Sequence, residues 1–195
     1  MDKIRIKEYR DSKWLDPRKF LVSLYEKQPF LQKIAKSEKE LTLENQDLEI
    51  YRESREAALF CVGLGTALGC EVKFLYDEDQ DRDFVVGVVS EKGMGLSDLQ
   101  LKRLPPESLN PHIDLESIIA GLKKYVDSKD LVVAIMVSRN IELDLNEIKL
   151  PDSVKLREAY IFGAIDPNQS KWFIYGNLCS TDRAYLEYDY PQNDT

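Results

Sequence analysis

Two kinds of hydrophobic periodicity divide the chain. Over residues 43–68, apolar residues recur at helical spacing and predict one long helix that ends at Gly69. After this glycine the period shortens to that of strands. The pattern there predicts a meander of three strands over residues 71–76, 82–89 and 97–103.

The second half of the chain predicts one more helix and several strands. Asp114 is expected to cap a helix whose apolar residues lie at helical spacing, namely Leu115, Ile118, Ile119, Leu122 and Tyr125. The uninterrupted apolar run over residues 131–137 predicts a central strand that is buried on both faces. Further strands are expected at 156–165, 172–178 and 184–190. We therefore expect an α/β fold in which a helix, a three-strand meander, a helix and a strand precede extra C-terminal strands.

The N-terminal segment has a different character. Residues 1–43 are expected to form a helical arm that packs outside the core, while residues 44–195 form the main domain, with its core at about 44–138. Asp16-Pro17 predicts a helix start, because Asp caps helices and Pro is favoured at the first helical position. Gln28-Pro29 is expected to interrupt this helix and to precede a second helical stretch.

Charge is distributed unevenly between the arm and the main domain. The arm carries 11 basic and 7 acidic residues and the rest of the chain 16 and 28, so that the chain as a whole has a net charge of −8. This balance counts against tight autonomous binding to phosphate backbones, which depends on Lys and Arg. A basic arm could contact nucleic acid, but a solvated helical surface is the favoured interpretation.

Composition excludes several classes of protein. A chain of 195 residues with 43% hydrophobic content is sufficient for one domain with a core. Its three cysteines, none of them in a Cys-x-x-Cys spacing, and its single histidine argue against a zinc site and favour a reducing compartment. The chain has neither a membrane-spanning apolar stretch nor the apolar core of a signal peptide, so we expect a cytoplasmic protein that does not contact the membrane.

The predicted hairpin carries the most informative chemistry. Asp83 begins its first strand, residues 90–95 are expected to form its loop, and Gln100 and Lys102 lie two residues apart, on one face of its second strand. The strand after Asp83 is apolar on both faces, which places this carboxylate near the interior of the sheet. The alternative is an ordinary Asp at a strand end with a surface Lys. We favour the layout of a metal-dependent nuclease site.

The element order and these residues together resemble the PD-(D/E)XK nuclease superfamily, which has the restriction-endonuclease-like fold. The resemblance is to its Mrr-like Gln-x-Lys variant and covers about residues 44–138. The chain also resembles a group of uncharacterised bacterial proteins described as candidate endonucleases, which share stretches like Leu99-Gln100-Leu101-Lys102, Pro105-Pro106, Leu109-Asn110-Pro111 and Gln169-Ser170-Lys171-Trp172. The resemblance implies a Mg²⁺-dependent endonuclease (Mn²⁺ is possible), with DNA as the expected substrate and a homodimer as a possible assembly. The alternative is a catalytically silent member that binds protein or nucleic acid as a regulatory module.

The resemblance also assigns roles. Asp83 would be the principal metal ligand, and Gln100 would offer a neutral carbonyl oxygen where most of the superfamily has Glu, so the metal should bind more weakly. Lys102 would orient the attacking water or stabilise the phosphate. The implied metal ligands are therefore Asp83, Gln100 and a Glu of the first helix, for which we favour Glu56.

The choice of helix Glu stays open at this point. Glu49, Glu53 and Glu56 follow one another along one helix face. Glu56 is favoured because it directly precedes the apolar residues 57–60, and Glu53 is second. The alternative is that all three are solvated.

Other matches favour ordinary structure. Glu71-Val72-Lys73 also fits Glu-x-Lys, but is expected to be a plain strand. Arg103 could contact phosphate or simply pair with an acid. Lys123-Lys124 and Tyr125 could line a substrate groove, but an amphipathic helix is the favoured reading.

Overall fold

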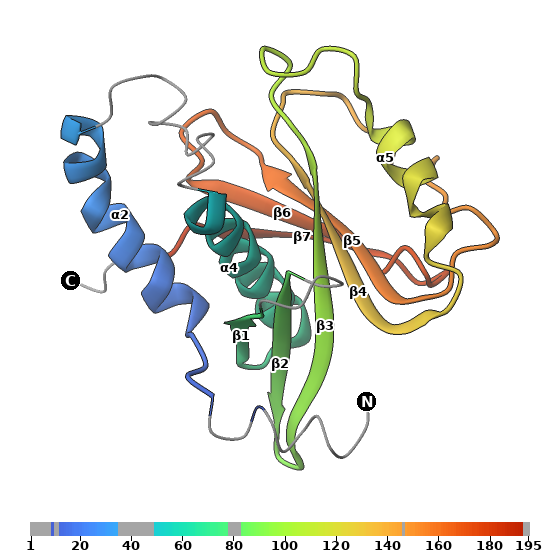
Figure 1. Ribbon diagram of the computed structural model, residues 1–195, viewed down its shortest axis with the longest axis horizontal. Helices are drawn as coiled ribbons and strands as arrows, with labels where there is room; N and C mark the ends of the chain where they lie inside the picture. Colours follow the sequence, from blue (N-terminus) through green and yellow to red (C-terminus); the bar gives the residue numbers. More distant parts are fainter. Residues whose placement is uncertain (1–8, 10–11, 35–48, 78–82, 146, 193–195) are drawn as a thin grey trace.

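The structure, a computed structural model, describes residues 9, 12–34, 49–77, 83–145 and 147–192. Its described part is a mixed α/β fold with three helices and one curled sheet of seven strands (Figure 1). The helices are α2 (Pro17–Ile34), α4 (Glu49–Leu68) and α5 (Leu115–Gly121), which continues as the 3-10 turn Leu122–Lys124. No helix in these ranges is long and apolar enough to span a membrane.

The seven strands lie in the sheet in the order in which they occur in the chain. They are β1 (Val72–Tyr76), β2 (Phe84–Ser90), β3 (Gly93–Leu104), β4 (Ser128–Val137), β5 (Leu156–Ala164), β6 (Lys171–Gly176) and β7 (Ala184–Asp189). β3, β4 and β5 are parallel neighbours, and every other neighbouring pair is antiparallel. The predicted meander and the predicted order of helices and strands are both present.

Strand β4 separates two layers of core. Its residues 131–137 are all buried, which confirms the predicted central strand. Val132, Ala134 and Met136 belong to the core beneath α4, which we call the α4-side core. Val133 and Ile135 belong to the core beneath α5, the α5-side core. Because alternate residues of a strand point to opposite faces, this one apolar run supplies both layers.

The helical arm departs from the prediction in two ways. α2 continues through Pro29 as a single helix, so the expected interruption at Gln28-Pro29 is wrong. Proline has a backbone φ that suits a helix, and here it costs one hydrogen bond without ending the helix. Leu21 is fully buried in the α4-side core, so α2 does not pack wholly outside the core as expected.

The first predicted helix and the hairpin loop also differ in extent. α4 is described from Glu49 onwards, and the predicted start at residue 43 lies outside the described residues. Its end is confirmed, because Gly69 has a φ of +64°. The expected loop over residues 90–95 is shorter: Ser90 already pairs with Gly93, whose φ of +115° permits the tight turn.

Candidate functional site

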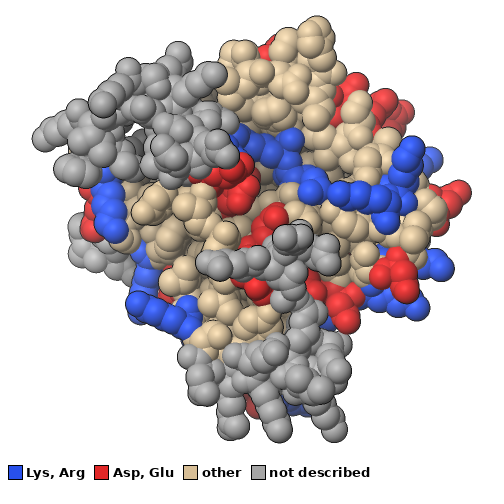
Figure 2. All heavy atoms as spheres, viewed as in Figure 1, with Lys and Arg blue, Asp and Glu red and all other residues tan. Residues whose placement is uncertain are grey.

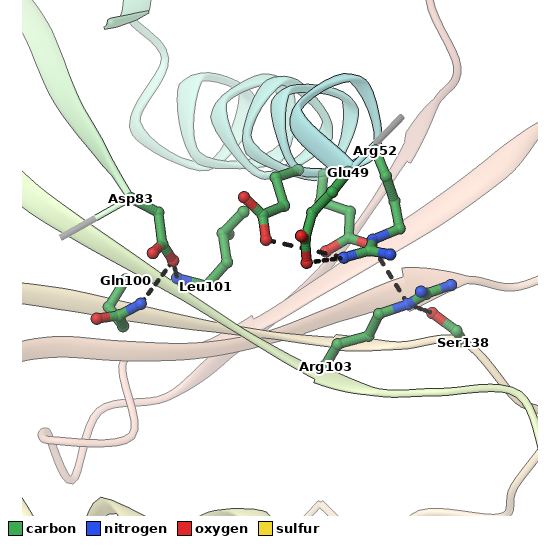
Figure 3. Close-up of polar contacts among 9 residues, drawn as sticks. Glu49, Arg52, Asp83, Gln100, Leu101, Arg103 and Ser138 are labelled. Carbon is green, nitrogen blue, oxygen red and sulfur yellow. Dashed lines mark hydrogen bonds and ion pairs between the residues drawn. The ribbon is translucent and has the colours of Figure 1, made fainter. Parts of the chain in front are cut away.

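The β2–β3 hairpin brings Asp83 and Gln100 together. Phe84 pairs with Leu99, so the next position in this register sets Asp83 opposite Gln100. Gln100 Nε2 donates to Asp83 Oδ2 at 2.6 Å, and the Leu101 N–H donates to the same oxygen at 2.7 Å (Figure 3). The N–H of Asp83 in turn donates to the Leu99 carbonyl at 3.1 Å. The carboxylate is therefore anchored at the mouth of the hairpin by both backbone and side chain.

Lys102 shares a face of the sheet with Gln100. Gln100 pairs with Val133 of β4 and Lys102 pairs with Ile135, and both partners belong to the α5-side core. Burial lowers the pKa of Lys102, and the nearby Lys124 ammonium lowers it further, while the Asp83 and Glu53 carboxylates oppose the shift. Lys102 is therefore a half-buried ammonium that lies in the combined field of two carboxylates and one further lysine.

Glu53 is the helix acid that acts on the hairpin. Burial raises the pKa of Glu53, and the Asp83 carboxylate raises it further, while Arg52 and Lys102 lower it. A divalent cation near Glu53 would offset the repulsion that the Asp83 carboxylate exerts on the charged form of Glu53. Glu53, the second choice from sequence, thus lies in the electrostatic neighbourhood of Asp83 and Lys102.

Glu56, the first choice from sequence, is placed differently. Its side chain is 4% exposed, and Oε1 lies 3.3 Å from Arg103 Nε and 4.0 Å from Arg52 Nε. Arg103 Nε also donates to Ser138 Oγ at 3.0 Å. In Figure 3 Arg103 and Ser138 lie on one side beneath α4 and the Asp83–Gln100 pair lies on the other. The structure therefore joins Glu56 to two arginines and not to Asp83.

The environment of Glu56 sets its protonation. Burial raises the pKa of Glu56 to about 7, although the guanidinium groups of Arg103 and Arg52 oppose the shift. Arg52 is shared among the three helix acids, since it also lies 3.0 Å from Glu49 and 3.8 Å from Glu53. Of the two sequence interpretations of Arg103, pairing with an acid is the one that the structure shows. Glu49 is half exposed and is held by Arg52.

The rival Glu-x-Lys triplet forms a local ion pair. Lys73 Nζ lies 3.3 Å from Glu71 Oε1, and both side chains are accessible to solvent. These residues flank Val72, whose side chain points into the α4-side core. Glu71-Val72-Lys73 therefore behaves as the start of an ordinary strand, as expected from the sequence.

Sequence reasoning gave too little weight to two residues of this region. Lys124 and Tyr125 follow α5. Burial raises the pKa of Tyr125 and the Asp83 carboxylate raises it further, while burial lowers the pKa of Lys102 and the Lys124 ammonium lowers it further. In the sequence, the only feature that pointed to these residues was the pair Lys123-Lys124 beside Tyr125. The same pattern is common at the ends of amphipathic helices, so it did not single them out.

The donor atoms suit a hard divalent cation. Asp83 and Glu53 carry carboxylate oxygens and Gln100 carries an amide oxygen, which are ligand types that Mg²⁺ prefers, but in this structure the Gln100 amide turns its nitrogen toward Asp83. Within the described ranges, no group of three or more His, Cys, Asp and Glu side chains is arranged to hold a metal ion. A site here would therefore depend on two carboxylates, on Gln100 and on oxygens of water or substrate.

Comparisons with known proteins identify no relative of this chain. No protein-family model, no curated protein and no solved structure gives a significant match to the chain. The function is therefore inferred from the geometry of the site.

Proposed function

We propose that this protein is a metal-dependent endonuclease that hydrolyses phosphodiester bonds, with DNA as the expected substrate and Mg²⁺ or Mn²⁺ as the cofactor. The observation that carries the proposal is the strand register, which sets Asp83 opposite Gln100 and places Lys102 two residues after Gln100 on the same face. The element order from α4 to β4 supports a restriction-endonuclease-like core around this group.

The metal would neutralise charge on the phosphate and activate water. Asp83 would be its principal ligand, Glu53 the second carboxylate and Gln100 a neutral one. Glu53 replaces Glu56 in this assignment, because Glu56 is held by Arg103 and Arg52. Two carboxylates and a neutral amide hold less negative charge than three acids, so binding of the metal should strengthen when the substrate phosphate is present.

Lys102 has the properties of a group that acts on the phosphate. It is half buried, and it makes no ion pair with any residue in the described part of the chain. Its ammonium would stabilise the negative charge that develops on the phosphate or orient the attacking water. Its loss should reduce turnover more than binding.

A second function is a catalytically silent nuclease fold that serves as a binding module. One observation favours it: the amide of Gln100 donates to Asp83 at 2.6 Å, so that these two groups satisfy each other without a cation. The net charge of −8 points in the same direction, because it weakens attraction for nucleic acid.

The test is cleavage of supercoiled plasmid and of single-stranded DNA in Mg²⁺ or Mn²⁺. Asp83→Asn, Glu53→Gln and Lys102→Gln should each lower the rate by about a hundredfold or more, as expected for the loss of a group that acts on the transition state. Glu71→Gln and Lys73→Gln are the matched controls, since they make the same chemical changes in the Glu-x-Lys pair of β1.

The outcomes separate the two functions. Metal-dependent cleavage that is lost in the three site variants and retained in both controls supports the nuclease. If the purified wild type cleaves nothing, or if Asp83→Asn cleaves as fast as the wild type, the nuclease proposal fails and the binding module takes its place.

A further inference from the structure

One arginine of α4 is held by two aromatic rings and an amide. The guanidinium carbon of Arg55 lies 5.5 Å from the centroid of the Trp172 ring and 5.8 Å from the centroid of the Tyr190 ring. Its Nη2 donates to Gln169 Oε1 at 2.7 Å. Trp172 is fully buried, and its Nε1 donates to the Gln169 carbonyl at 2.8 Å, so the ring and the amide are fixed relative to each other. A guanidinium confined in this way loses less entropy when it binds a ligand than an arginine on an open surface does.

This guanidinium has no carboxylate partner within the described ranges. None of the ion pairs there includes Arg55. The neighbouring Glu56 is held by two other arginines: burial raises the pKa of Glu56, and those two partners oppose the rise more strongly than Arg55 does. A guanidinium has five N–H donors in a planar fork, so the bond to Gln169 leaves donors for an anion such as phosphate.

Exposed tyrosine rings lie beside this arginine. Tyr25 of α2 is 66% exposed, and the centroid of its ring lies 6.4 Å from that of Tyr190. α2 packs against α4 (Figure 1), and the Tyr190 hydroxyl donates to the Leu21 carbonyl of α2 at 3.3 Å. Tyr51 is 53% exposed and lies one helical turn before Arg55 on α4, so these two side chains share a face. The guanidinium is therefore flanked by aromatic rings that solvent can reach.

The charge of the chain favours a ligand that binds by stacking. The net charge is −8, and Figure 2 shows basic side chains lying beside acidic ones on the face seen in Figure 1. The field of the whole protein therefore does not attract a polyanion. Stacking of bases on aromatic rings does not need such a field, because every base has a π face. A single strand of nucleic acid offers unpaired bases next to phosphates, whereas a peptide of Asp and Glu offers anions with no ring to stack.

We propose that Arg55 and Tyr25 form a binding site for single-stranded nucleic acid, in which the guanidinium contacts a phosphate and the Tyr25 ring stacks on a neighbouring base. Gln169 and Trp172 hold the guanidinium in place. This inference rests on the proposed nucleic-acid substrate and names its single-stranded form. Arg55 follows Glu53 by two residues, so the strand site and the candidate metal site share α4.

The test is equilibrium binding of fluorescently labelled oligothymidylate in EDTA, so that no metal-dependent cleavage occurs. Tyr25→Ala should weaken binding about tenfold and leave the slope of log K against log salt unchanged, because it removes stacking and no charge. Arg55→Gln should weaken binding and reduce this slope by about 0.7, as expected for the loss of one phosphate contact to a single strand. Arg55→Lys should retain the slope and bind more weakly than the wild type, because an ammonium keeps the charge and lacks the planar fork.

Matched controls make the same changes elsewhere. Tyr185→Ala removes an exposed tyrosine that stacks on Phe173 at the start of β7, away from Tyr190. Arg18→Gln removes an exposed arginine from the first turn of α2. A labelled strand of abasic sites keeps the phosphates and removes the bases, so Tyr25→Ala and the wild type should bind it equally.

Each outcome decides the inference. Losses of affinity in Tyr25→Ala and Arg55→Gln that exceed those in the two controls support it, and losses no larger than in the controls overturn it. Polyglutamate that displaces the labelled strand as well as unlabelled oligothymidylate of equal charge also overturns it, in favour of a site for an acidic peptide. Wild-type protein that binds no oligonucleotide overturns it as well.

Parallel cleavage assays in Mg²⁺ separate this inference from the proposed catalysis. Binding that depends on Tyr25 and Arg55, without any cleavage by the wild type, would leave the inference standing and remove the nuclease proposal. Cleavage lost in Asp83→Asn, together with unchanged binding in Tyr25→Ala and Arg55→Gln, would leave the nuclease standing and remove the inference.

Discussion

Arg103 Nε at the end of β3 lies 3.3 Å from Oε1 of Glu56 on α4, and the Glu56 side chain is almost completely buried. The pair links the helix to the strand that carries Gln100 and Lys102. Ser138, just after β4, accepts a hydrogen bond from the same Nε at 3.0 Å, so three elements meet at one guanidinium. Removing one partner of a buried ion pair is costly because the other charge remains in a poorly solvated position.

We therefore expect Arg103→Gln to destabilise the protein in a pH-dependent way. At pH 8, where Glu56 is ionised, the loss in free energy of unfolding should be about 3 kcal/mol. At pH 5, where the folded protein holds Glu56 protonated, the loss should be smaller, at about 1 kcal/mol. Urea denaturation at both pH values measures this. Ser138→Ala is the control, since it removes a hydrogen bond and no charge, and should cost a similar small amount at both. Equal losses for Arg103→Gln at the two pH values would contradict the role of the ion pair.

Glu56 should itself make stability depend on pH. Its pKa is raised from an ordinary 4.5 to about 7, so the folded chain binds more protons at this group than the unfolded chain does between these values. The contribution of Glu56 to stability is therefore present below about pH 4.5 and is lost as pH rises to about 7. Relative to Glu56→Gln, the wild type should lose up to about 3 kcal/mol across this window. Denaturation of both proteins from pH 4.5 to 8 tests it, and a difference that stays constant or grows with pH would show that the sign is wrong.

Two glycines in helical segments should respond oppositely to alanine. A Cβ on Gly63 would lie 2.7 Å from Cε1 of Tyr188, whose hydroxyl donates to the Leu59 carbonyl at 2.9 Å and whose ring is therefore held. We expect Gly63→Ala to cost about 1–3 kcal/mol, despite the better helix propensity of Ala. Gly121 has helical backbone angles and no atom within 4 Å of a Cβ, so Gly121→Ala should stabilise by about 0.5–1 kcal/mol. Thermal unfolding of the two variants compares them directly, and a stabilised Gly63→Ala would rule out the close contact.

The meeting of Asp83 with Gln100 could be anticipated because both residues belong to one hairpin. Strand alternation sets which residues share a face, and the antiparallel register then brings the start of one strand opposite the end of the next. The position of Glu53 could not be derived in this way. Glu49, Glu53 and Glu56 lie on one helix face, and the way α4 crosses the sheet decides which of them pairs with Arg103 and which has its charge disfavoured by Asp83.

The sequence by itself determined the elements whose signals are local. These are the apolar run that became β4, the glycine that ends α4 and the alternation that orients Gln100 and Lys102. Only the tertiary structure decided that Leu21 enters the core and that Glu56 pairs with Arg103. Periodicity reports the direction of a side chain relative to its own helix or strand, whereas partners from different elements are chosen by how those elements pack, and packing depends on the whole core.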